Sequence, residues 1–111
     1  MTSEPGAESD APTTGLPAGV VMFATRFCGY CQRARMLLEG KGIDFEEIRV
    51  DRDPRQRRRM REIAGANSVP QIFIDGHHVG GCDQLYALER SGGLDPLLAG
   101  VAAHDAAPDR N

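Results

Sequence analysis

The sequence predicts one α/β domain whose centre is a four-stranded mixed sheet with helices on both faces, in the order βαβαββα. Three observations lead to this prediction. A continuous apolar run at residues 20–24 is followed by a helical pattern and then by a partly alternating run at 45–50, which together form a βαβ unit. An Asp-Pro pair at 53–54 is a typical helix start. An Asp-Gly pair at 75–76 lies between two short strand-like runs, which indicates a tight antiparallel hairpin.

The first half of the chain is expected to form the centre of the sheet and one edge. Residues 20–24 are apolar throughout, which is typical of a strand covered on both faces. In residues 29–40 the apolar side chains that recur at helical spacing are Cys31, Ala34 and Leu38. Residues 45–50 alternate less regularly, so they suit a half-buried strand nearer the edge.

The second half is expected to add a helix, the hairpin and a third helix. The second helix is predicted between the capping residue Asp53 and the stop at Gly65. Strands are expected at 71–74 and 77–79, and a helix follows at 82–90 with two glycines after it. A single turn at 95–98 should end the fold.

Two tails are predicted around a folded domain at residues 19–98. Residues 1–18 are rich in Ser, Thr, Pro, Gly and acidic residues, which predicts a disordered acidic N-terminal tail. Residues 99–111 are mostly small and polar, which predicts a flexible C-terminal tail. A chain of 111 residues has enough length for one modest core.

Charge and cysteine usage narrow the classes of function. The net charge is −3, which argues against a general nucleic-acid or membrane-surface partner. The chain has no cationic start followed by an apolar core and no apolar stretch long enough to span a bilayer, so we expect a cytoplasmic protein. Three cysteines do not form a secreted disulfide framework, which indicates redox or metal chemistry in a reducing compartment.

Cys28 and Cys31 stand three residues apart where the first helix begins. The unpaired N–H groups and the positive dipole end of a helix N-terminus favour the thiolate, which is the reactive form of cysteine. Cys28 would lie just outside the first turn and be open to substrate, whereas Cys31 would point back toward it. We therefore expect Cys28 to be the nucleophile and Cys31 to be the resolving thiol that attacks a mixed disulfide at Cys28.

Three motifs follow one another along the chain: Cys28-Gly29-Tyr30-Cys31, Val69-Pro70-Gln71-Ile72-Phe73-Ile74-Asp75-Gly76 and Gly80-Gly81-Cys82-Asp83. In the order and spacing of these motifs, the region from about residue 20 to residue 98 resembles a dithiol-class bacterial glutaredoxin. The resemblance implies a thioredoxin-like fold and glutathione-dependent reduction of disulfides, above all of protein–glutathione mixed disulfides. The implied partners are glutathione and glutathionylated or disulfide-containing proteins.

The resemblance also implies where glutathione binds. The backbone of Val69, just before a proline expected to be cis, would pair with the cysteinyl part of glutathione as a short added strand. The N–H of Cys82 and the carboxylate of Asp83, at a helix start, would hold the two ends of the γ-glutamyl group. The other implied contacts are the loop proline Pro70, the groove wall Tyr30 and the cations Arg26 and Arg57.

The chain departs from the family pattern at three positions. Gly29 stands where proline is usual, which loosens the turn between the cysteines and frees a backbone N–H. Thr25 stands where lysine is common, and Arg26 is the cation nearest in sequence that could replace it. Gln84 stands where a second aspartate often follows Asp83, which weakens only one glutathione contact.

Two alternatives belong to other classes of function. Similar glycine-containing variants can hold a [2Fe–2S] cluster, so one alternative is a dimer in which Cys28 from each copy, with two glutathiones, binds the cluster for transfer or sensing. Without a cluster we expect a monomer and no metal. The other alternative is a zinc site at Cys28 and Cys31, but a second cysteine pair at zinc spacing is missing, and His77 and His78 are expected at the surface.

Overall fold

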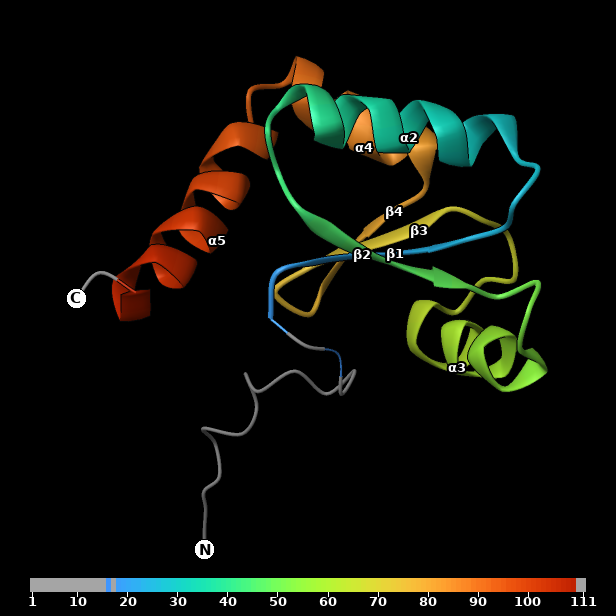
Figure 1. The fold of residues 1–111 in the computed structure, drawn as a ribbon. Coiled ribbons are helices and arrows are strands. Elements are labelled where there is room, and N and C mark those ends of the chain that lie inside the picture. Colours follow the sequence, from blue (N-terminus) through green and yellow to red (C-terminus); the bar gives the residue numbers. More distant parts are fainter. Residues whose placement is uncertain (1–15, 17, 110–111) are drawn as a thin grey trace, which may run out of the picture.

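The chain folds into a four-stranded sheet with helices on both faces (Figure 1). The computed structural model describes residue 16 and residues 18–109, with side chains as far as residue 101. In chain order the elements are β1 (Val20–Ala24), α2 (Gly29–Gly40), β2 (Phe45–Arg49), α3 (Pro54–Ala64), β3 (Gln71–Ile74), β4 (His77–Gly80), α4 (Cys82–Arg90) and α5 (Leu94–Asp109). The predicted order βαβαββα is confirmed, and α5 follows it as a further helix.

The strands lie side by side in the order β2-β1-β3-β4. β1 pairs parallel with β2 and antiparallel with β3, and β3 forms the predicted antiparallel hairpin with β4. Every residue of β1 and β3 is buried, whereas β2 is only partly covered at its edge position. β1 is therefore the central strand that its apolar run predicted, and its end leads directly into α2.

Side chains alternate across the central strands and enter two apolar layers. On one face Met22 and Ile72 pack with residues of α2, α4 and α5, and Leu38 and Leu85 are fully buried there. Figure 1 shows α2 and α4 over this face and α3 over the opposite one.

The layer on the α3 face is smaller. Phe23 and Phe73 meet edge to face, with their ring centroids 5.9 Å apart, and pack against Met60 of α3. Fully burying a side chain of this size contributes about 1.5–3 kcal/mol. The two layers together hold β1 rigidly beneath the start of α2.

Local signals determine where α3 and the hairpin begin and end. The side chain of Asp53 accepts the N–H of Arg55 at 3.0 Å, and Gly65 ends α3 in the left-handed region at φ 69°. The hairpin turn places Asp75 at φ 51° and Gly76 at φ 83°. Two consecutive residues with positive φ are what an Asp-Gly two-residue hairpin requires.

The structure differs from the predictions near both ends of the chain. The predicted single turn at 95–98 is wrong, because α5 extends from Leu94 to Asp109. Val101, in the range of the predicted C-terminal tail, is buried on the α2 and α4 face. Leu16, in the range of the predicted N-terminal tail, is 5% exposed and packs with the layer on the α3 face. Residues 1–15 and 17 of that tail lie outside the described residues.

Candidate active site

Cys28 lies where β1 has ended and α2 begins. It is the N-cap of α2, with extended backbone at φ −143° and ψ 115°, and its Sγ accepts the backbone N–H of Cys31 at 3.3 Å. The same sulfur lies 3.9 Å from the backbone oxygen of Val69. The thiol is therefore held between the N-terminus of α2 and the segment Ser68–Pro70, which we call the 68–70 loop.

The surroundings of Cys28 favour its ionised form. Partial burial raises the pKa of the Cys28 thiol, but hydrogen bonds from Cys31, from the backbone N–H of Tyr30 and from the side chain of Thr25 outweigh burial and lower the pKa below its usual value. The donors belong mainly to the first turn of α2, as the helix-start argument predicted. Cys28 is thus a partly exposed thiol whose surroundings favour the ionised, nucleophilic form.

Cys31 has the opposite environment. It is fully buried on the α2 and α4 face, and burial together with the neighbouring Cys28 sulfur raises the pKa of Cys31 to about 12. Both cysteines are free thiols in this structure. The pair therefore combines a partly exposed thiol of lowered pKa with a buried thiol of raised pKa one turn away, which is an asymmetry that suits an attacking and a resolving cysteine.

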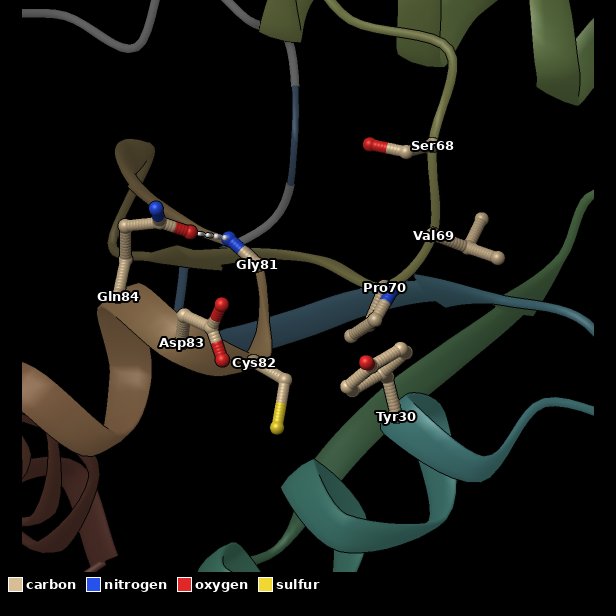
Figure 2. A pocket seen from close by; sticks show the side chains of 8 residues that line it. All are labelled: Tyr30, Ser68, Val69, Pro70, Gly81, Cys82, Asp83 and Gln84. Atoms are coloured by element: carbon tan, nitrogen blue, oxygen red, sulfur yellow. Dashed lines mark hydrogen bonds between the residues drawn. The ribbon is translucent and has the colours of Figure 1, made fainter.

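A shallow groove lies beside the cysteine pair, between the start of α4 and the 68–70 loop (Figure 2). Its volume of about 210 Å³ is below the usual range for small-molecule pockets, so a ligand would lie along it rather than inside it. The groove is lined by Tyr30, Ser68, Val69, Pro70, Gly81, Cys82, Asp83 and Gln84. The structure thus brings five of the predicted glutathione-binding residues together: Tyr30, Val69, Pro70, Cys82 and Asp83.

The predicted cations lie outside this lining. The backbone N–H of Arg26 donates to Asp51 at 3.1 Å, and its guanidinium lies over the ring of Phe27, 5.0 Å from the centroid. Arg57 of α3 donates to the backbone oxygen of Asn67 at 3.1 Å and to its side chain at 3.2 Å. Arg57 is therefore held next to the 68–70 loop, whereas the guanidinium of Arg26 contacts the ring of Phe27.

Pro70 and the start of α4 line opposite sides of the groove. The peptide bond before Pro70 is cis, as predicted. Cys82 is 4% exposed, and burial raises the pKa of its thiol, so its sulfur is a poor nucleophile. Asp83 is exposed in the first turn of α4, where its carboxylate can reach a ligand.

Three residues that line the groove are not among the predicted glutathione-binding residues: Ser68, Gly81 and Gln84. The Oε1 of Gln84 accepts the N–H of Gly81 at 2.8 Å, which is the dashed bond in Figure 2. Gln84 therefore caps α4 in addition to facing the groove. Its place three residues after the N-cap was a usable sequence signal for capping. Gly81 packs so closely that an added Cβ would meet the backbone oxygen of Pro70 at 3.2 Å.

In the described part of the chain, no group of three or more His, Cys, Asp or Glu side chains is arranged to hold a metal ion. His77 and His78 are both exposed on β4. The same residues contain no helix that is long and apolar enough to cross a membrane.

Comparison with known proteins finds the same combination of motif and fold. Residues 20–79 match the family model described as Glutaredoxin. The chain is 49% identical over 81 residues to Glutaredoxin 3 of Escherichia coli (strain K12), covering 73% of this chain and 98% of that protein. It is 52% identical over 80 residues to Glutaredoxin of Pseudomonas aeruginosa, covering 72% and 95%. The crystal structure of a buckwheat glutaredoxin–glutathione complex is similar with a TM-score of 0.71 at 32% identity, covering 76% of this chain and 79% of that one.

Proposed function

Because this chain belongs to the glutaredoxin family of thiol–disulfide oxidoreductases, we propose that glutathione is its reductant and that Cys28 and Cys31 are its attacking and resolving thiols. Its substrates would be protein–glutathione mixed disulfides and protein disulfides. The proposal is supported by the lowered pKa of Cys28, the raised pKa of Cys31 and the groove beside them.

Reduction of a glutathionylated protein takes two exchange steps. The Cys28 thiolate attacks the glutathione sulfur, a Cys28–glutathione disulfide forms, and the protein leaves as a thiolate that takes a proton from water. The thiolate of a second glutathione then attacks the glutathione sulfur of that disulfide. This step releases oxidised glutathione and restores the Cys28 thiolate.

A protein disulfide requires Cys31. After Cys28 has formed a mixed disulfide with the substrate, Cys31 loses its proton and attacks the Cys28 sulfur, which frees the second substrate thiol and leaves a Cys28–Cys31 disulfide. Two glutathiones then reduce this disulfide and leave as oxidised glutathione. Burial and the neighbouring Cys28 sulfur both raise the pKa of Cys31, and a mixed disulfide at Cys28 would remove the second of these two causes.

The groove offers groups of the right kind for each part of glutathione. The backbone N–H groups at the start of α4 suit the γ-glutamyl carboxylate, and the Asp83 carboxylate suits the γ-glutamyl ammonium. The backbone of Val69 lies beside the Cys28 sulfur and suits the cysteinyl peptide group. Arg57, held next to the 68–70 loop, is the cation proposed for the glycine carboxylate. Arg26 would attract the same carboxylate at longer range.

The single observation that carries the proposal is the position of the Cys28 sulfur, which accepts a hydrogen bond from the N-terminus of α2 and lies beside this groove. We would measure turnover of a glutathionylated peptide with glutathione, glutathione reductase and NADPH. Cys28→Ser should abolish turnover. Cys31→Ser should keep part of the deglutathionylation but lose reduction of protein disulfides. Full turnover in Cys28→Ser would show that the nucleophile is wrongly assigned.

The alternative function, a dimer that binds an iron–sulfur cluster, is tested with wild type and Cys28→Ser. We expect wild type purified without oxygen to be colourless and monomeric. A brown dimer with visible absorption that disappears in Cys28→Ser would favour the cluster function instead.

A further inference from the structure

Gln71 is a buried amide directly after the 68–70 loop. It is the first residue of β3 and 4% exposed, and among side chains that the structure describes it is the buried polar one. A buried amide must find hydrogen-bond partners, because each unsatisfied group costs about 1–3 kcal/mol. The partners of Gln71 lie outside its own strand, in the 68–70 loop and on β4.

The orientation of the Gln71 amide is determined by Ser68. The amide Nε2 donates to the backbone oxygen of Ser68 at 3.0 Å and to its Oγ at 3.3 Å. Since a carbonyl oxygen can only accept, the nitrogen of Gln71 must face the loop and its Oε1 must face away. That Oε1 lies 2.6 Å from the Nε2 of His78, which therefore carries the hydrogen.

His78 is in turn held by the sheet. The pairing of β3 with β4 is irregular between Ile72 and Phe73, and it sets His78 opposite Phe73. The imidazole stacks on the Phe73 ring, with centroids 4.8 Å apart and planes 26° apart. Phe73 is fully buried against Phe23. The contacts thus run continuously from the aromatic core through His78 and Gln71 to Ser68.

We propose that Gln71 and His78 are positioning residues that hold the 68–70 loop in the shape in which it binds glutathione. This inference rests on the proposed function. Ser68 and Val69 wall the groove, and the loop has its buried side-chain anchor at Gln71. The hydrogen bonds that lower the pKa of Cys28 come from Cys31, Tyr30 and Thr25, which do not belong to this loop. Loss of the anchor should therefore weaken glutathione recognition without changing the thiolate.

The test measures the KM for a glutathionylated peptide, kcat and the pKa of Cys28 in three variants. His78→Phe keeps the aromatic stack but removes the donor, and Gln71→Leu removes all three hydrogen bonds of the Gln71 side chain. His77→Phe is the matched control, because His77 is the exposed neighbour on β4 and takes no part in these contacts. The pKa is obtained from the pH dependence of alkylation by iodoacetamide.

We expect KM to rise about two- to tenfold in His78→Phe and at least as much in Gln71→Leu, the loss that one uncharged hydrogen bond represents. The values of kcat and the Cys28 pKa should stay at wild type, and His77→Phe should match wild type throughout. If Gln71→Leu fails to fold, His78→Phe decides, since its side chain lies on an exposed edge strand.

Two results would overturn the inference, and they differ from failure of the proposed function. Unchanged KM in folded His78→Phe, or a fall in kcat together with a shifted Cys28 pKa, would show that the pair does not position the loop selectively. Wild type that lacks glutathione-dependent turnover would instead overturn the proposed function, and this inference with it.

Discussion

Replacing Gly29 by proline should stabilise the protein and leave the reactivity of Cys28 unchanged. Gly29 is the first residue of α2, directly after the N-cap Cys28. The N–H of this position has no acceptor within the helix, so a proline there loses no helical hydrogen bond. An added Cβ at Gly29 meets nothing within 4 Å, so the new ring has space at its attachment point.

The residue before a proline must also be compatible, because the proline ring pushes it toward extended backbone. Cys28 already has φ −143° and ψ 115°, at the edge of that region. The substitution therefore fixes a conformation that the folded chain has, and it restricts the unfolded chain. Such changes typically stabilise by about 0.4–1 kcal/mol. For a domain of this size that corresponds to a rise of about 2–8 °C in Tm.

The pKa of the Cys28 thiol should not change in Gly29→Pro. The backbone donors that lower the pKa of Cys28 are the N–H groups of Cys31 and Tyr30, and both remain in Gly29→Pro. We would compare thermal unfolding of the reduced proteins and the pH dependence of iodoacetamide alkylation. Gly29→Ala is the control and should give part of the stabilisation, since it lacks the ring. A lower Tm for Gly29→Pro, or a pKa shift of about one unit, would refute the reasoning, because the N–H of Gly29 would then be a donor to the sulfur.

Three further predictions concern the free energy of unfolding. Gln84→Ala should lower it by about 1 kcal/mol, because the N–H of Gly81 loses its acceptor, whereas Gln84→Glu keeps an acceptor oxygen and should lower it much less. Urea denaturation measures both variants, and equal losses would contradict the capping role. Burial raises the pKa of Cys31 to about 12, whereas a cysteine in the unfolded chain has a pKa of about 8.5. The unfolded state therefore releases this proton first, and the reduced protein should lose stability as pH rises from about 8.5 toward 12. Cys31→Ala should reduce this loss, which urea titrations across that pH range measure. Leu16→Ala should cost about 2 kcal/mol in the same assay, and Leu97→Ala, 38% exposed, less than about 0.5 kcal/mol; similar effects of the two would show that Leu16 is not packed.

The elements that the sequence predicts correctly have their causes within a few residues. The Asp-Pro start of α3, its glycine stop and the Asp-Gly hairpin each depend on local backbone preferences, so each can be read without knowing the fold. The same is true of the lowered pKa of Cys28, because its donors Thr25, Tyr30 and Cys31 all lie within three residues of it in the sequence. The most reactive part of the candidate site is thus also its most local part.

The features that escaped prediction depend on contacts distant in sequence. Leu16 is a single large apolar side chain in a run of threonine, glycine, proline and alanine, and only its place in the same buried layer as Met60 shows that it belongs to the core. α5 is a different case, because Leu94, Leu98 and Val101 follow helical spacing that could have predicted a longer helix. Ala99 and Gly100, which lie between Leu98 and Val101, contribute little to an apolar pattern, so the helix was expected to end before them.

The candidate site therefore divides into two parts with different physical origins. Ionisation of Cys28 depends on the first turn of α2, whereas the shape of the groove depends on α4 and on a loop tied to Gln71 and His78. If the two parts are independent, Gly29→Pro should change stability alone and His78→Phe should change KM alone, and their effects should add in the double variant. Coupling between them would have to pass through the 3.9 Å contact of the Cys28 sulfur with the backbone oxygen of Val69, where the loop meets the thiol. A double variant that departs from additivity would identify that contact as the link between recognition and reactivity.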